Sequence, residues 1–129
     1  MIDHLYLRVS NYAASKAFYS SVLEAIGAKA IMEFPGLCGY GQHGSAFKQV
    51  KFFIADAAKG PEVTPIHCAF RCETSHEVDE FYNKALAAGA KDNGQPGIRA
   101  HFQPNYYAAY VLDPDGHNIE AVCHTGIDK

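Results

Sequence analysis

The sequence predicts an α+β fold built from two copies of one βαβββ module. Two observations support this prediction. Short stretches of the first half recur in the same order in the second half, and each half shows a strand, a helix, a glycine-containing turn and then shorter strands. The chain has 129 residues, the length of one domain. We therefore expect a single domain over 1–129, with one module at about 1–59, a linker at 60–65 and a second module at about 66–129.

The internal repeat is clearest in the segments DHLYLRVS at 3–10 and IHCAFRCE at 66–73. At one offset of 63 residues the following pairs are identical: His4 with His67, Arg8 with Arg71, Phe18 with Phe81, Tyr19 with Tyr82, and Leu23 with Leu86. The stretch AIGAK at 25–29 then matches AAGAK at 87–91 with one residue removed. Chance does not readily produce so many matches in order, so the two modules should share one fold.

The first module should open with a strand over 2–9, where apolar and polar residues alternate. A helix is expected over 12–26, with Asn11 or Ser10 as its N-cap. The apolar stripe of this helix consists of Phe18, Val22 and Ile26. Shorter strands should follow near 30–34, 37–42 and 47–55.

The second module carries a capping box, Thr74 with Glu77, at the start of its expected helix. Apolar positions then recur with a helical period at Val78, Phe81, Tyr82, Ala85 and Leu86. Gly89 is expected to end the helix. Shorter strands should follow near 98–102, 106–112 and 117–124. The linker sequence GPEVTP, with two prolines and a glycine, separates the modules.

Composition and charge narrow the class of protein. Apolar residues make up 48% of the chain, enough for a packed core, and the formal net charge is -3. No run of Lys or Arg indicates a nucleic-acid or membrane surface, and the N-terminus lacks a signal-peptide pattern. We therefore expect a cytoplasmic protein with a small-molecule substrate and no nucleic-acid or membrane partner. The four cysteines are not spaced as zinc pairs and are expected to be reduced core thiols.

Strand alternation should place polar residues on the sheet face away from the helices. The apolar residues expected against the helices are Leu5, Leu7 and Val9 on the first strand, Ile66, Cys68, Phe70 and Cys72 on its repeat, and Ile119, Ala121 and Cys123 on the last strand. The opposite face then gathers His4, His67 and Glu120. A carboxylate buried in a sheet is costly unless it is paired or bound to a metal.

Two imidazoles and one carboxylate are a ligand set for a divalent transition metal, and three ligands leave positions open for water or substrate. A single histidine on a strand is more often a surface or core residue than a ligand. Here two histidines occupy equivalent positions of a repeat, and Glu120 lies near the end of the second copy, which favours a metal site. The donor set accommodates zinc, nickel, manganese, iron or cobalt.

These residues resemble the vicinal oxygen chelate superfamily, which includes glyoxalase I, extradiol dioxygenases, fosfomycin-resistance thiol transferases and bleomycin-binding proteins. The resemblance is carried by DHLYLRV, IHCAFRC and DPDGHNIEAV and by the helices FYSSVLEAIGAK and FYNKALAAGAK. It implies that the two sheets curl into an incomplete barrel around one divalent metal ion, with His4, His67 and Glu120 as ligands. It also implies that modules pair within a chain or by exchange between chains. With exposed sheet edges in each module, we expect a homodimer.

The resemblance implies a lyase or transferase, similar to lactoylglutathione lyase, that stabilises an enolate or alkoxide of a substrate with vicinal oxygens. Glyoxalase I carries a fourth ligand, a carboxylate, on the last strand of its first module. The corresponding stretch QVKFFIAD has no carboxylate before Asp56, and the slot falls at Phe52 or a neighbour. A three-ligand set fits a thiol transferase or an oxygen-activating site better. An extradiol-type dioxygenase and a metal-free binding protein similar to bleomycin-resistance proteins are the alternatives.

The segment GIRAHFQPNYYAAY at 97–110 supplies candidates for the wall of the site. Tyr110 and His101 are the candidate catalytic residues. The resemblance to the thiol transferases implies a tyrosine facing the substrate at the place of Tyr110, where a phenol can hydrogen-bond a developing oxyanion. An imidazole such as that of His101 can transfer a proton. Arg99 and Tyr107 are the candidate substrate-binding residues. We expect Arg99 and His101 to share one face of a short strand.

The place of Tyr110 depends on the turn between the last two strands. If DPDGH forms the turn, Leu112 pairs with Asn118, and Tyr110 lies opposite Glu120 on the same face. A turn one residue shorter would place Tyr107 on that face instead.

Overall fold

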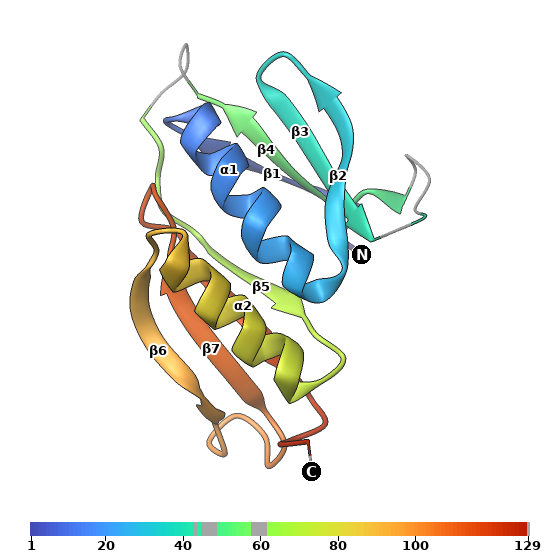
Figure 1. Cartoon of the computed structure of the whole chain (residues 1–129), viewed down its shortest axis with the longest axis vertical. Coiled ribbons are helices and arrows are strands. Elements are labelled where there is room, and N and C mark those ends of the chain that lie inside the picture. Colours follow the sequence, from blue (N-terminus) through green and yellow to red (C-terminus); the bar gives the residue numbers. More distant parts are fainter. Residues whose placement is uncertain (43, 45–48, 58–61, 129) are drawn as a thin grey trace. The chain divides into compact units, whose positions relative to one another are not determined.

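The computed structural model describes residues 1–42, 44, 49–57 and 62–128. The chain divides into two compact units, Met1–Thr64 and Pro65–Lys129, which we call the first and second modules. Each module contains a four-stranded sheet and a long α-helix (Figure 1). The strand expected near 47–55 and the linker expected at 60–65 each include residues outside the described ranges.

The first module follows the order strand, helix and three strands, with a short 3₁₀ helix (η1) after the α-helix. Its elements are β1 Leu5–Val9, α1 Tyr12–Val22, η1 Leu23–Ile26, β2 Ala28–Phe34, β3 Leu37–Gln42 and β4 Phe52–Asp56. The strands lie in the order β1-β4-β3-β2. β1 runs parallel to β4, and the other neighbours are antiparallel.

The second module repeats this arrangement. Its elements are β5 His67–Arg71, α2 Ser75–Ala87, β6 Lys91–Ile98, β7 Tyr107–Leu112 and β8 Asn118–Cys123. The strands lie in the order β5-β8-β7-β6, with β5 parallel to β8 and the other neighbours antiparallel. The α+β class and the duplicated βαβββ module are therefore confirmed, and both sheets are open.

Local hydrogen bonds explain where the helices begin. Asn11, and not Ser10, is the N-cap of α1, since its side chain accepts from the backbone N–H of Ala14 at 3.1 Å. Thr74 caps α2 by accepting from the N–H of Glu77 at 3.2 Å, while the Glu77 carboxylate accepts from the N–H of Glu73. Among the described residues, no helix is long and apolar enough to span a membrane.

The helix of each module lies against the apolar face of its own sheet (Figure 1). Buried residues of the first module include Leu7, Val9, Phe18, Tyr19, Val22 and Ile54, and those of the second include Val78, Phe81, Ala85, Val111, Ile119 and Ala121. The predicted alternation holds at the start of the chain, where His4 and Tyr6 are exposed while Leu7 is buried. The face of the first sheet opposite α1 therefore carries His4 and Tyr6.

The strand expected near 98–102 is misplaced. β6 lies earlier, at Lys91–Ile98, and residues 99–106 form a loop. The sequence KDNGQPGI has a low strand propensity because it contains two glycines and a proline. This sequence can form a strand because β6 lies at the edge of its sheet. Its pairing with β7 is irregular on both sides of Gly94. A proline in an edge strand does not break hydrogen bonds between inner strands.

Candidate metal centre and pocket

Glu120 lies on β8, an inner strand of the second sheet, and is 2% exposed. Its Oε2 lies 2.8 Å from Nε2 of His67, the first residue of β5. The parallel register places His67 opposite Asn118 and Ala69 opposite Glu120, so both side chains stand on the same face of the sheet. The second module by itself thus brings two of the three expected ligands into contact.

The other oxygen of Glu120 is also engaged. Tyr106, which directly precedes β7, donates its phenolic hydrogen to Oε1 of Glu120. Burial, followed by the hydrogen bond to Glu120, raises the pKa of Tyr106, so the phenol stays protonated as the donor. Sequence reasoning missed Tyr106. Strand alternation could have found it, because residues 106 and 110 fall on one face whenever Tyr110 faces Glu120.

Tyr110 lies where it is expected if DPDGH forms the turn between the last two strands. In the β7–β8 pairing Leu112 is opposite Asn118 and Tyr110 is opposite Glu120. The centroid of the Tyr110 ring lies 6.1 Å from that of His67, and the rings are tilted by 62°. Tyr110 therefore stands one strand away from the carboxylate, on the same face.

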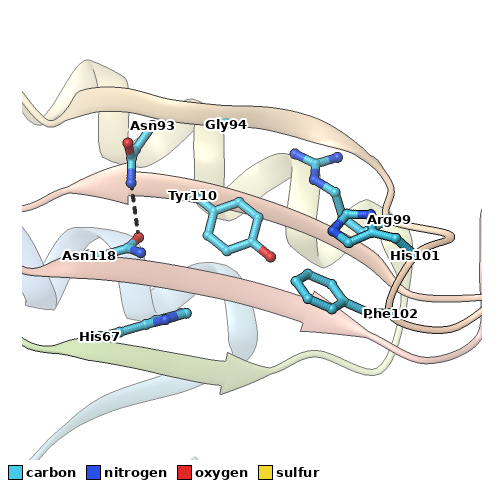
Figure 2. Close-up of a pocket in the computed structure, with 8 residues that line it drawn as sticks. All are labelled: His67, Asn93, Gly94, Arg99, His101, Phe102, Tyr110 and Asn118. Carbon is cyan, nitrogen blue, oxygen red and sulfur yellow. Dashed lines mark hydrogen bonds between the residues drawn. The ribbon is translucent and has the colours of Figure 1, made fainter.

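An open pocket of about 370 Å³ lies on this face of the second module (Figure 2). Its lining residues are His67, Asn93, Gly94, Arg99, His101, Phe102, Tyr110 and Asn118. Figure 2 shows the linked amides of Asn93 and Asn118 on one side of Tyr110, and Arg99, His101 and Phe102 on the other. The pocket thus combines neutral hydrogen-bonding groups, one cation and aromatic surface around His67.

Arg99 is held in place above Tyr110. Its guanidinium carbon lies 5.4 Å from the centroid of the Tyr110 ring, and its Nη2 donates to the carbonyl of Gln95 at 2.7 Å. A Cβ at Gly97 would lie 3.0 Å from Nη1 of Arg99, and one at Gly94 would lie 3.3 Å from Nη2. The two glycines of β6 therefore leave room for a fixed guanidinium at the pocket.

His101 reaches the pocket from the loop at 99–106 and not from a strand, which corrects the expectation that it shares a strand face with Arg99. The loop is closed by a hydrogen bond from the N–H of Arg99 to the carbonyl of Tyr106 at 2.7 Å. Within it, the ring centroids of His101 and Phe102 are 4.1 Å apart, and Phe102 is 58% exposed. This pair forms an aromatic rim of the pocket.

Tyr107 does not reach the pocket. It is 8% exposed, and its hydroxyl donates to Oδ1 of Asp79 on α2 at 2.6 Å. Since β7 alternates, Tyr107 faces α2 while Tyr110 lines the pocket. The substrate contact expected for Tyr107 is therefore not supported, and Tyr106 is the tyrosine that accompanies Tyr110 on this face.

His4, the third expected ligand, belongs to the first module and directly precedes β1. It is exposed, and its Nδ1 lies 2.6 Å from Oδ1 of Asp3. The hydrogen bond with His4 lowers the pKa of Asp3. The His4 ring also contacts two aromatic rings, with centroid distances of 5.5 Å to Tyr6 and 5.8 Å to Phe53.

The register of the first sheet identifies the residue equivalent to Glu120. Tyr6 pairs with Phe53 as Ala69 pairs with Glu120, so Phe53, and not Phe52, occupies that place. Gly39 pairs with Phe53 as Tyr110 pairs with Glu120. A Cβ at Gly39 would lie 2.5 Å from the Phe53 ring. The first module therefore has a phenyl ring where the second has its carboxylate and tyrosine.

The donor set of the second module fits a divalent metal. Two neighbouring ligands at about 2.1 Å from one ion lie roughly 3.4 Å apart in tetrahedral and roughly 3.0 Å apart in octahedral geometry. The 2.8 Å between Nε2 of His67 and Oε2 of Glu120 is therefore short by only a few tenths of an ångström. An imidazole nitrogen with a carboxylate oxygen suits a borderline transition metal. Within residues 1–42, 44, 49–57 and 62–128, no group of three or more His, Cys, Asp or Glu side chains is gathered as a complete ligand set.

Two of the cysteines, Cys68 and Cys72, are unsuited to nucleophilic chemistry. All four are free thiols, as expected, and Cys38, Cys72 and Cys123 are buried. Burial raises the pKa of Cys68 to about 11 and is the main cause that raises the pKa of Cys72 to about 12. A thiolate at either position would therefore be scarce at neutral pH.

The chain is similar to known proteins in both sequence and fold. The model of the Glyoxalase/Bleomycin resistance protein/Dioxygenase superfamily matches residues 1–121. The chain is 30% identical to the metallothiol transferase FosB of Shouchella clausii (strain KSM-K16), over 97% of this chain and 80% of that protein. Two crystal structures share the fold, one of a glyoxalase/bleomycin resistance protein and one of a glyoxalase/bleomycin resistance protein/dioxygenase family enzyme. The one from Albidiferax ferrireducens T118 has a TM-score of 0.77, 24% identity, and coverage of 94% of this chain and 96% of its own. The one from Burkholderia phytofirmans PsJN has a TM-score of 0.71, 20% identity, and coverage of 95% and 98%.

Proposed function

The chain belongs to the glyoxalase/bleomycin resistance protein/dioxygenase superfamily, and from this premise we propose that it is a divalent-metal-dependent enzyme. We propose further that it is a transferase that adds a thiol to a small substrate with vicinal oxygens. The observation that carries this proposal is the buried carboxylate of Glu120 in contact with His67 at the edge of a pocket. The similarity to a metallothiol transferase supports the choice of reaction.

The proposed metal ligands are His67, Glu120 and His4. A metal held there supplies a Lewis acid that polarises the oxygens of the substrate. The hydrogen bond between Nδ1 of His4 and Asp3 leaves Nε2 of His4 as the coordinating nitrogen. Metal-ligating histidines usually have a carboxylate or carbonyl partner of this kind on the other ring nitrogen.

The proposed reaction moves one proton and exchanges one bond. The sulfur of a thiolate forms a bond to a carbon that bears oxygen, the bond from that carbon to the oxygen breaks, and the oxygen takes up the proton that the thiol gave away. Tyr110 donates a hydrogen bond to this oxygen as its negative charge develops. Burial, with a smaller effect of the Glu120 charge, raises the pKa of Tyr110, so the phenol is protonated in the resting protein.

Arg99 and His101 have separate proposed roles at the other side of the pocket. The guanidinium of Arg99, fixed above Tyr110, holds an anionic group of the substrate by charge and hydrogen bonding. The exposed imidazole of His101 accepts the proton of the incoming thiol. Both side chains line the pocket that contains His67.

Phe53 argues against the reaction of glyoxalase I. A phenyl ring cannot bind a metal or accept a proton, so the fourth carboxylate expected for that enzyme is lacking at its repeat-equivalent position. Thiol addition needs no base at this position, because the proton leaves the thiol and not the carbon of the substrate.

Two measurements test the proposal. Protein purified without chelator should contain one divalent metal per His4–His67–Glu120 set, and metal titration should reach the same stoichiometry. A screen with zinc, nickel, manganese, iron and cobalt should then detect consumption of thiol with epoxide substrates that carry a phosphonate or carboxylate. Activity only with hemithioacetals or only with catechols would refute the transferase assignment, and failure to bind any of the five metals would refute the metal site.

A further inference from the structure

Resting on the proposed metal site, we propose that Tyr106 is a positioning residue for Glu120, which holds one carboxylate oxygen so that the other is presented to the metal. The two oxygens of Glu120 have different partners. Oε1 accepts from the hydroxyl of Tyr106, and Oε2 lies beside His67. The hydrogen bond from Tyr106 to Oε1 therefore keeps Oε2 of Glu120 on the side of His67.

A carboxylate on a strand needs such a partner to be a well-defined ligand. The Glu120 side chain can rotate about its terminal bond, and this rotation exchanges the two oxygens. A hydrogen bond from a protonated phenol to Oε1 opposes that rotation. The nearly complete burial of Glu120 strengthens the effect of the hydrogen bond from Tyr106, because little water is available to replace that bond.

Tyr106 is itself held rigidly. Its backbone carbonyl accepts from the N–H of Arg99 at 2.7 Å, and its own N–H donates to the carbonyl of Gln103 at 3.2 Å. Its ring packs edge-on against His124, with centroids 5.3 Å apart, and against Phe102 at 5.1 Å. The loop thus delivers the hydroxyl from a fixed position, as a positioning role requires.

Tyr106 differs from Tyr110 in what it can touch. Tyr110 lines the pocket, whereas Tyr106 and Glu120 are not among the lining residues. The hydroxyl of Tyr106 therefore acts on the carboxylate and not on the substrate. Partners of this kind in metal sites typically change metal affinity by about 10- to 100-fold when removed.

Tyr106→Phe and Tyr107→Phe form a matched pair for the test. Each variant removes one hydroxyl that donates to a carboxylate, toward Glu120 in the first and toward Asp79 on α2 in the second. Phenylalanine keeps the ring contacts of Tyr106, and a thermal melt of the metal-free protein checks the fold of each variant. Calorimetric titration with Zn²⁺ and with Mn²⁺ then measures metal affinity.

The expected result is an affinity about 10- to 100-fold weaker in Tyr106→Phe and unchanged in Tyr107→Phe. In the double variant Tyr106→Phe with Glu120→Ala, affinity should equal that of Glu120→Ala alone, since no carboxylate remains for Tyr106 to hold. Tight binding by Tyr106→Phe, equal to that of the natural chain, would overturn this inference and leave the metal site standing. Additive losses in the double variant would overturn it as well. A natural chain that binds neither ion overturns the metal site and this inference together.

Discussion

Replacing Glu120 with Gln should weaken metal binding far more than it changes stability. Glutamine has the shape of glutamate, and its oxygen can still accept the hydrogen bond from Tyr106. What is lost is the negative charge of a group that is 2% exposed and lies 2.8 Å from Nε2 of His67. The variant therefore separates the role of the charge from the role of the shape.

The magnitude follows from the burial of this carboxylate. A charge kept out of water carries a desolvation penalty of several kcal/mol, and the imidazole of His67 with the phenols of Tyr106 and Tyr110 offsets it only in part. Without metal, Glu120→Gln should therefore leave the free energy of unfolding within about 1 kcal/mol of the natural chain, or raise it. Loss of an outer partner lowers metal affinity about 10- to 100-fold, so loss of an anionic ligand should exceed roughly 100-fold.

Thermal melts with and without Zn²⁺, together with calorimetric titration, measure both quantities. At a metal concentration 100 times the dissociation constant of the natural chain, binding adds about 2.7 kcal/mol of stability. A variant that binds 100-fold more weakly gains only about 0.4 kcal/mol at that concentration. Asp79→Asn is the control, because it alters a carboxylate that is hydrogen-bonded to Tyr107 on the helix side of the sheet. This variant should retain the full stabilisation by metal. Unchanged affinity in Glu120→Gln would refute the ligand assignment.

Three further predictions concern the pocket, the first module and the assembly. Tyr110→Phe should lower the rate with a substrate about 100-fold while the melting temperature stays close to that of the natural chain, and a normal rate would show that the hydroxyl is not used. Gly39→Ala should lower the free energy of unfolding by about 1–3 kcal/mol, because the added Cβ would lie 2.5 Å from the ring of Phe53 and 2.8 Å from Val50. A loss below about 0.5 kcal/mol would show that the ring can move aside. Sedimentation should detect a homodimer, and a monomer across a wide concentration range would refute that expectation.

Much of the fold could be predicted from the sequence because the repeat and strand alternation constrain each other. The pairing of His4 with His67 in the repeat predicted two modules of one topology, and the structure confirms the topology. The sequence left two turn lengths open between the last two strands, and the structure has the one in which DPDGH forms the turn and Tyr110 lies opposite Glu120. Turn length and a period of two residues thus reduced this long-range register to two possibilities.

The parts that could not be predicted depend on irregular backbone. β6 contains Gly94, Pro96 and Gly97, which lower its strand propensity, and its pairing with β7 supplies what the local sequence lacks. The loop at 99–106 contains His101 and Tyr106, and its backbone path is set by hydrogen bonds within the loop. No periodic pattern in the sequence predicts such a path. The expected role of Tyr107 in the pocket could have been corrected from the sequence alone. Strand alternation from Tyr110 places Tyr106, and not Tyr107, on the same face.

The difference between the two modules bears on the chemistry of the site. Glu120 and Tyr110 in the second module are replaced by Phe53 and Gly39 in the first, and the missing side chain of Gly39 provides the space that the ring of Phe53 fills. A side chain at position 39 is therefore incompatible with the present position of the Phe53 ring. The exchange of a carboxylate for Phe53 also changes the charge of the proposed ligand set. One carboxylate leaves one positive charge of a divalent ion uncompensated, whereas a second carboxylate at position 53 would cancel it. A site with residual positive charge attracts an anionic oxygen more strongly than a neutral one. In the proposed site, the absence of a fourth carboxylate thus favours the same kind of substrate as the role we propose for Arg99, one that carries negative charge beside its reacting oxygen.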